Sequence, residues 1–202
     1  MWCRFLGVAL SMLLLVPTTA MAQLPGASML LIASNTLTDP RFSETVVLVT
    51  RHGRSPPIGV IVNRPMTSTL GLLFPKLPEA ELKRPLEYGG PVAADQISFL
   101  YRSAEGSEDS IAVAPGVHLG RAGQTLSRLL RGEHPHRGLK VFVGYSGWAF
   151  GQLEKEIERG DWYVLPVDEK AIFDQPAATM WRELHRRASI TSASIPTTCP
   201  AT

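Results

Sequence analysis

Short apolar runs separated by polar turns dominate the chain after residue 28. Residues 29–33 (MLLIA), 45–50 (TVVLVT) and 58–63 (IGVIVN) are compact and rich in aliphatic or β-branched side chains, a pattern typical of buried strands. The turns between them are short and contain Pro, Gly or Asp, which favours antiparallel pairing of neighbouring strands. Similar runs predict further strands at residues 97–101, 139–145 and 162–167, and two short strands within 111–119 on either side of Pro115 and Gly116.

Helical spacing of apolar residues occurs between the predicted strands in the second half of the chain. It predicts helices over residues 124–130, 148–159 and 177–187. A short helix is also expected at 68–73, and the proline-bounded stretch 75–85 is expected to be a surface loop. Because strands joined by short loops come first and helices enter later, the order of elements predicts a single α+β domain and not a doubly wound parallel sheet.

The N-terminal segment has a different pattern. Arg4 precedes an apolar run at residues 5–16 that is too short to span a bilayer comfortably. Small residues follow it, as at signal-peptidase sites. The pattern predicts a secretory signal peptide over residues 1–22, cleaved between Ala22 and Gln23, and therefore a periplasmic or secreted protein. An uncleaved N-terminal anchor is the alternative.

The mature chain is expected to form one domain over residues 23–187. Residues 188–202 are rich in Ser, Thr and Pro, show no periodicity, and are expected to form a disordered tail. The chain carries 20 Lys and Arg against 18 Asp and Glu, a formal net charge of +2. A charge so close to balance does not call for a nucleic-acid or anionic-membrane partner.

The segment with the most distinctive chemistry is residues 144–154 (GYSGWAFGQLE), between a predicted strand and a predicted helix. Ser146 in that context resembles a nucleophile elbow, although the elbow requires Gly where Trp148 stands. The same glycine-rich turn could instead bind an anion through free backbone amides at the start of the helix. A third interpretation is a tight turn with Trp148 and Phe150 packed into the core, continued by Leu153 and Ile157.

Metal and cofactor sites have little support in the sequence. His134 and His136 could both face a metal, but no third ligand is evident nearby, and two solvated histidines are the simpler interpretation. The glycine spacing matches neither the dinucleotide-binding fingerprint nor a P-loop, so no cofactor is expected. Arg41 and Arg64, which lie in polar turns, could bind a carboxylate or tie loops together through backbone carbonyls.

Several separated motifs, in order along the chain, resemble the YqgE/AlgH family. They are LLIAS, DPRFSETVVLVT, GVIVNRP, GGPV and GYSGWAFGQLEKEIERGDW. The resemblance implies an α+β domain whose bent, partly barrel-like and mainly antiparallel sheet is flanked by helices. It carries over no catalytic residue. The positions that match the family's motifs, and are candidates for a shared ligand site, are Asp39, Arg41, Phe42, Asn63, Gly89, Gly90, Pro91, Gly144, Tyr145, Gly147, Trp148, Gly151, Gln152 and Glu154, to which the elbow hypothesis adds Ser146.

Three functional hypotheses remain open from the sequence. The first is a non-catalytic binding or interaction protein of the cell envelope, with a small anionic ligand or an envelope protein docking near residues 144–151. The second is a hydrolase-like enzyme that uses Ser146. The third is the transcriptional role proposed for the family, which requires a cytoplasmic protein because export would separate the chain from DNA.

Overall fold

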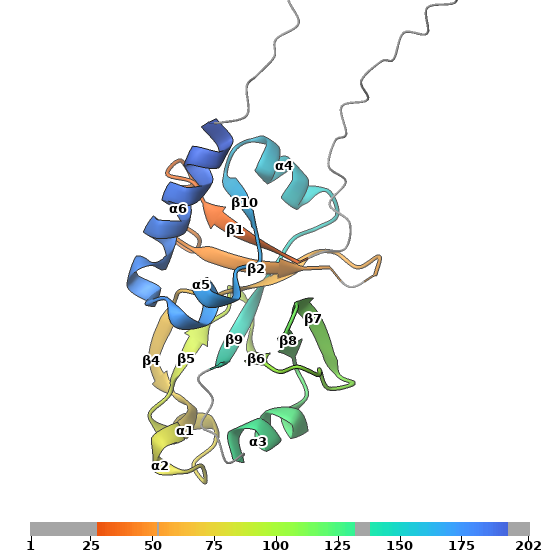
Figure 1. The fold of residues 1–202 in the computed structure, drawn as a ribbon, viewed down its shortest axis with the longest axis vertical. Coiled ribbons are helices and arrows are strands. Elements are labelled where there is room, and N and C mark those ends of the chain that lie inside the picture. The colour runs from red at the N-terminus through yellow and green to blue at the C-terminus, as the bar shows by residue number, and fades with distance from the viewer. Residues whose placement is uncertain (1–27, 52, 132–137, 194–202) are drawn as a thin grey trace, which may run out of the picture.

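The computed structural model describes residues 28–51, 53–131 and 138–193 (Figure 1). The strands are β1 (Met29–Ala33), β2 (Val46–Thr50), β3 (Ile58–Ile61), β4 (Pro65–Thr69), β5 (Pro85–Tyr88), β6 (Val92–Arg102), β7 (Ser110–Ala114), β8 (Val117–Gly120), β9 (Leu139–Gly147) and β10 (Trp162–Pro166). The helices are α1 (Leu70–Leu73), α2 (Glu79–Leu82), α3 (Gly123–Arg131), α4 (Gln152–Glu158), α5 (Glu169–Asp174) and α6 (Ala177–Ala193).

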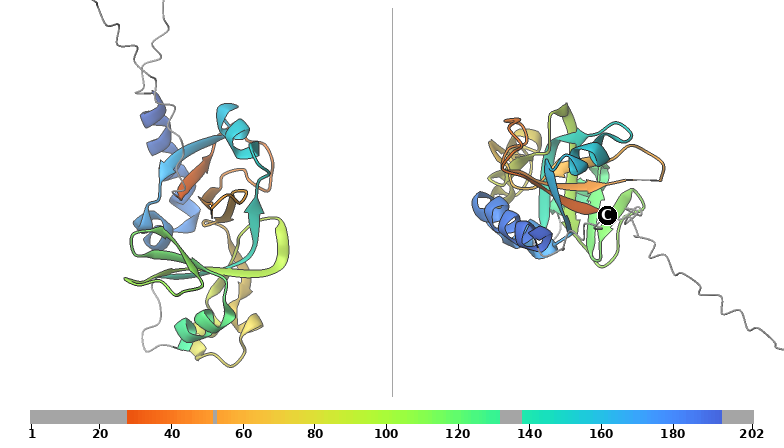
Figure 2. Two further views of the ribbon diagram at one scale, coloured as in Figure 1. Left: turned by 90° about the vertical axis from the view of Figure 1, so that its right-hand side faces the viewer. Right: turned by 90° about the horizontal axis from the view of Figure 1, so that it is seen from above.

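The strands form one curled sheet in the order β10-β1-β2-β3-β9-β6-β8-β7, with β4 and β5 attached beside β9. Every strand pair in it is antiparallel except β5 with β9. Strand β9 pairs with β3, β5 and β6, so it joins the β10-β1-β2-β3 half of the sheet to the β6-β8-β7 half. The C-terminal end of β9 lies between β3 and the start of β6. The predicted α+β class and the bent, mainly antiparallel sheet are confirmed (Figures 1 and 2).

The first three strands are buried on both faces, which explains their uninterrupted apolar runs. Alternate residues such as Leu30 and Leu48 pack against α5 and α6, where Leu184 is fully buried. The intervening residues, such as Leu31, face Leu153 of α4. Helices α6 and α4 accordingly lie on opposite sides of β1 and β2 (Figure 2). Truncating a buried leucine of this kind to alanine costs about 2–5 kcal/mol.

The positions of two prolines explain why the elements predicted between β3 and β6 differ from those in the structure. Residues 65–69 form β4, so the short helix predicted from 68 begins only at Leu70. Within the predicted loop at 75–85, residues 79–82 form α2, and Pro85 opens β5. Proline is tolerated as the first residue of a strand, where no ladder donor is required.

The predicted helix at 148–159 starts later than expected. Gly151 has a left-handed backbone (φ 72°), and the helix α4 begins at Gln152. Because the turn before it is not helical, Phe150 points outward and is 70% exposed, while Trp148 is buried as predicted. The prediction that Phe150 packs in the core was therefore wrong.

The predicted C-terminal tail also begins later than expected. Helix α6 continues through Ala193, and Ala188 is buried against the sheet side of the helix. The prediction of disorder from residue 188 was wrong for 188–193, because Ser and Thr extend a helix that packing already stabilises. The signal peptide, the two loop histidines and residues 194–202 lie outside the described residues. No helix within the described ranges is long and apolar enough to cross a membrane.

Candidate ligand-binding site

A cleft of about 410 Å³ lies between the turn that follows β1 and the start of α4. We call it the polar cleft. Its polar walls are formed mainly by Asp39, Arg41, Gln152, Glu156, Arg159 and Asp161. Aromatic rings line its base, and they belong to Phe42, Trp148 and Trp162. Phe42 and Trp148 each meet Trp162 edge to face, with ring centroids 5.9 and 6.4 Å apart.

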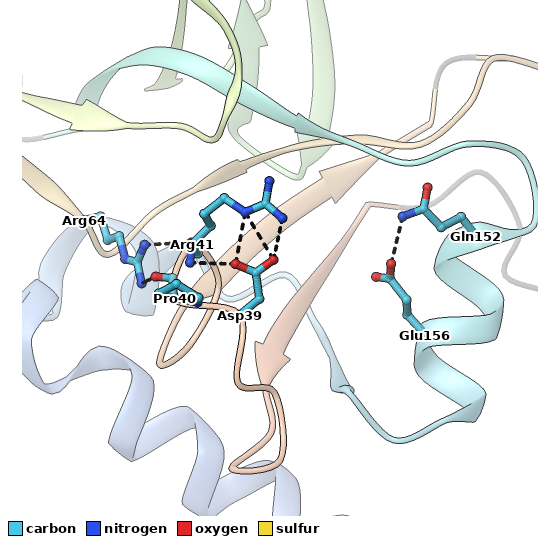
Figure 3. Close-up of polar contacts among 6 residues, drawn as sticks. All are labelled: Asp39, Pro40, Arg41, Arg64, Gln152 and Glu156. Atoms are coloured by element: carbon cyan, nitrogen blue, oxygen red, sulfur yellow. Dashed lines mark hydrogen bonds and ion pairs between the residues drawn. The ribbon is translucent and has the colours of Figure 1, made fainter.

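On the β1 side of the cleft, Asp39 and Arg41 form a closed ion pair. Asp39 Oδ1 accepts hydrogen bonds from the Arg41 amide (2.9 Å) and from Arg41 Nε (3.0 Å), and its Oδ2 accepts one from Arg41 Nη2 (2.6 Å). These hydrogen bonds from Arg41 lower the pKa of the Asp39 carboxyl and raise that of the guanidinium. Because the pair uses the Nε and Nη2 edge, Arg41 Nη1 remains for another acceptor (Figure 3).

Arg64 and Asn63 hold this turn in place. Arg64 donates to the carbonyls of Pro40 (3.2 Å), Arg41 (2.7 Å) and Ser43 (2.8 Å). Asn63 Oδ1 accepts from the amide of Val46, and its Nδ2 donates to a carbonyl of the same turn. Both side chains form hydrogen bonds with the backbone of the turn, and for Arg64 this is the loop-stabilising role given above as one alternative. Asn63 does not line the polar cleft.

The opposite wall carries a carboxylate fixed by three donors. Glu156 Oε2 accepts from the indole N–H groups of Trp148 (2.8 Å) and Trp162 (3.0 Å). Its Oε1 accepts from Gln152 Nε2 (2.9 Å), and Gln152 Oε1 in turn accepts from the Ala149 amide (3.0 Å). Figure 3 places Gln152 and Glu156 on α4, across the gap from Arg41. These three donors therefore fix the position of the Glu156 carboxylate at the wall of the cleft.

Glu156 and Arg159 were not among the predicted site residues. The sequence does contain a signal for Glu156, since Gln152 and Glu156 are four apart and share one face of a helix. The sequence could not show that the turn after β1 lies beside α4, because more than a hundred residues separate the two segments.

The predicted glycines allow two backbone segments to cross closely. A Cβ on Gly144, whose φ is +73°, would lie 2.5 Å from the carbonyl oxygen of Gly90. A Cβ on Gly89 would overlap the Gly144 carbonyl, and one on Gly90 would overlap Ser146. These three glycines therefore set the distance between the β5–β6 turn and β9. None of the three lines the polar cleft.

Ser146 does not occupy the position of a nucleophile. Its side chain is fully buried, and its Oγ donates to the Gly89 carbonyl at 3.2 Å. A nucleophile must be reachable by substrate and held against a general base, and the hydrogen bond of this hydroxyl goes to backbone. The geometry gives no support to the hydrolase hypothesis at this residue.

Glu154 faces away from the polar cleft. It forms an ion pair with Arg51 (2.7 Å), and this hydrogen bond lowers the pKa of the Glu154 carboxyl. Gly151 provides the turn into α4, and Tyr145 lines a different hollow. The structure thus brings together, from the predicted set, Asp39, Arg41, Phe42, Gly147, Trp148 and Gln152. Within the described residues, no group of three or more His, Cys, Asp and Glu could hold a metal ion.

Solved structures with the same fold come from two bacteria. Protein DIP2367 from Corynebacterium diphtheriae superimposes with a TM-score of 0.66 at 22% identity, over 81% of this chain and 87% of that one. The solution structure of the AlgH protein from Pseudomonas aeruginosa gives 0.65 at 23% identity, over 85% and 94%. At these identities the likeness concerns the fold alone.

Sequence relatives are more similar. UPF0301 protein CT0663 of Chlorobaculum tepidum is 35% identical over 75% of this chain and 81% of its own length. A UPF0301 protein of Serratia proteamaculans is 33% identical over 82% of this chain and 92% of its own length. The family model described as AlgH-like matches residues 30–193, from the first buried strand to the end of α6. The chain therefore belongs to the AlgH-like family.

Proposed function

We propose that this protein is a non-catalytic binding protein whose polar cleft takes a small molecule carrying an anionic group beside a hydrogen-bond donor. The observation that carries the proposal is the arrangement of Arg41, which is 61% exposed and held by Asp39 along one edge only. A guanidinium fixed in this way presents its remaining N–H groups to a carboxylate or phosphate oxygen without reorganising.

The charges that line the polar cleft restrict the class of ligand further. Asp39 is paired with Arg41, and Asp161 is paired with Arg159. Glu156 is held by neutral indole and amide donors, so the lining has one acid in excess. A ligand with only negative charge would be repelled by that carboxylate. An ammonium, amide or hydroxyl donor facing Glu156 Oε1 would turn the repulsion into a hydrogen bond.

Amino acids carry a carboxylate and an ammonium donor in one small molecule, and the aromatic rings that line the cleft suit an apolar side chain. We therefore take free amino acids as the ligand class to test. The common amino acids would be titrated one at a time into the purified protein, with the fluorescence of Trp148 and Trp162 as the readout. Any amino acid that binds would be titrated again as its carboxamide and as its N-acetyl derivative.

The expected result is saturable binding that weakens by about tenfold or more when either charged group of the amino acid is blocked, a loss of roughly 1.4 kcal/mol. Arg41→Gln should weaken binding by a similar factor. Arg182→Gln, an exposed arginine on α6, is the matched control and should bind as the wild type does. Unchanged affinity in Arg41→Gln would place the site elsewhere, and no saturable signal from any amino acid would exclude this ligand class.

We also propose, on the N-terminal pattern alone, that binding takes place outside the cytoplasm. N-terminal sequencing of the protein from fractionated native cells tests this location. A species that begins at Gln23 in the periplasm or the medium is expected. A cytoplasmic species that begins at Met1 would contradict it and would restore the transcriptional hypothesis.

A further inference from the structure

A second cleft of about 630 Å³ lies on the other side of Trp148. We call it the apolar cleft. Its apolar lining comes from the end of the β2–β3 turn, the start of β6 and the β7–β8 hairpin, and includes Pro57, Ile58, Val92, Ile111, Leu119 and Trp148. Figure 1 shows the β2–β3 turn and the β7–β8 hairpin on the same side of the molecule, next to the end of β9. Volume and lining are those of a small-molecule site.

We propose that the apolar cleft binds an amphipathic anion, of the class of medium-chain fatty acids, with its carboxylate at Arg121. Arg121 is exposed and lines the cleft, and its Cζ lies 5.8 Å from the centroid of the Tyr145 ring. This cation–π contact favours a position of the guanidinium near the ring, where its N–H groups stay available to an anion. Within the described ranges of the chain, Arg121 forms no ion pair, so its charge is not already neutralised there.

The wall behind Val92 is built from unusual backbone. Gly90 has φ +148°, Ala93 has φ +46°, and Gly144 on the facing strand has φ +73°. The pairing of β6 with β9 is interrupted between Val92 and Ile97, so residues 93–96 bulge out of the ladder. Val92 remains paired with Tyr145 and keeps an exposed apolar side chain in the lining. Of these three residues with positive φ, only Ala93 is a non-glycine residue, and backbone outliers of that kind cluster at binding and active sites, which supports a site beside Val92.

One acid, Asp109, also lines the apolar cleft, and it decides how the proposal is tested. Asp109 is exposed in the turn before β7 and forms no ion pair with Arg121. A carboxylate head group would be attracted by Arg121 and repelled by Asp109. We expect the effect of Arg121 to be the larger, because a cation–π contact with Tyr145 holds its guanidinium at the cleft. A cationic head group would be attracted by Asp109 and repelled by Arg121. Removing Arg121 should therefore weaken the binding of a carboxylate, and removing Asp109 should tighten it.

The experiment is calorimetric titration of the purified protein with decanoate, below its micellar concentration, and with decanol, below its solubility limit, as the uncharged control of equal chain length. We expect saturable decanoate binding about tenfold or more tighter than that of decanol, which corresponds to roughly 1.4 kcal/mol. Arg121→Gln should abolish the difference between the two ligands. Asp109→Asn should tighten decanoate binding and leave decanol unchanged. Arg128→Gln, an exposed arginine on α3 outside the lining, is the matched control and should behave as the wild type.

Two further outcomes separate this site from the polar cleft. Arg41→Gln should leave decanoate affinity unchanged, whereas the loss of decanoate binding in that variant would mean that the anion occupies the polar cleft. Equal affinities for decanoate and decanol, no change in Arg121→Gln, or weaker decanoate binding in Asp109→Asn would each overturn the proposal. Because both substituted side chains are exposed, far-UV circular dichroism of each variant should match that of the wild type.

Discussion

Trp148 Nε1 donates a hydrogen bond to Glu156 Oε2 at 2.8 Å, and this bond fixes the wall that the two clefts share. The indole ring separates the polar cleft from the apolar cleft, and its own backbone amide bonds to the Pro57 carbonyl at 3.2 Å. Trp148 is thus tied to the β2–β3 turn on one side and to α4 on the other. A change at Glu156 should therefore affect the fold as well as the polar cleft.

We expect Glu156→Gln to lower the free energy of unfolding by about 1–3 kcal/mol, because two buried indole donors lose a charged acceptor. In a domain of this size that loss corresponds to a decrease in Tm of several degrees. Urea denaturation followed by tryptophan fluorescence measures it. Glu158→Gln, an exposed neighbour on α4, is the control and should unfold as the wild type does. Equal stability of the two variants would show that the indole groups find other acceptors.

Gly144→Ala should be strongly destabilising. The substitution places a methyl group 2.5 Å from the Gly90 carbonyl oxygen at a residue whose φ is +73°. Positive φ alone disfavours alanine, and the overlap requires the β5–β6 turn to move. We expect a loss of more than about 2 kcal/mol in unfolding free energy. Gly123→Ala is the matched control.

Gly123 lies at the start of α3, and a Cβ there would meet no atom within 4 Å. Alanine should therefore be neutral there or stabilise the protein by about 0.4–1 kcal/mol. Similar unfolding midpoints for the two alanine variants would contradict the close crossing of β9 and the β5–β6 turn as the reason for glycine at position 144.

The strands of the first half could be predicted from the sequence because both of their faces are buried. Leu30 and Leu31 face opposite apolar clusters, so the run needs no polar interruption and its β-branched neighbours favour a strand. The elements between β3 and β6 could not be predicted in the same way. Pro65 and Pro85 suggested chain breaks, but each is the first residue of a strand, a position where tertiary pairing tolerates proline.

The polar cleft could be predicted only in part, for a different reason. Asp39 and Gln152 were each identifiable as candidates, yet their proximity depends on the antiparallel pairing of β1 with β10, which brings α4 beside the β1 turn. Asn63 was predicted as a candidate ligand-binding residue because it matches a motif of the family. Only the structure shows that the side-chain amide of Asn63 forms hydrogen bonds with the backbone of Val46 and Glu44.

A buried pair at the centre of the sheet predicts a specific pH dependence. Lys140 Nζ lies 2.7 Å from Glu87 Oε1 and donates to the Val62 carbonyl at 3.1 Å. Glu87 Oε2 is buried and has no hydrogen-bond partner in the part of the chain that the structure describes. Burial raises the pKa of the Glu87 carboxyl, and the opposing effect of Lys140 is smaller. Glu87 therefore binds its proton more tightly in the folded protein than in the unfolded chain.

The sign of the effect follows from this difference. Between the ordinary glutamate pKa of about 4.3 and the raised folded value, the folded state holds more protons than the unfolded state, so stability is lost as pH rises. Urea unfolding of the wild type and of Glu87→Gln at several pH values isolates the contribution. The wild type minus variant difference should decrease with rising pH, by at most about 1.4 kcal/mol per pH unit. A difference that increases with pH would mean that Lys140 outweighs burial.

A substitution at Ser146 distinguishes a structural role of this residue from a catalytic one. Its hydroxyl is fully buried and donates to the Gly89 carbonyl, so Ser146→Ala removes one hydrogen bond and leaves a buried acceptor without that donor. Because the Gly89 carbonyl still accepts from the Ile61 amide, we expect the unfolding free energy to fall by only about 0.5–1.5 kcal/mol and amino-acid or decanoate binding to stay unchanged. The wild type should also resist labelling by a fluorophosphonate probe, with a known serine hydrolase as the positive control. Labelling that is present in the wild type and absent in Ser146→Ala would reverse this assignment, because a buried hydroxyl reaches such a probe only if the β5–β6 turn opens away from β9.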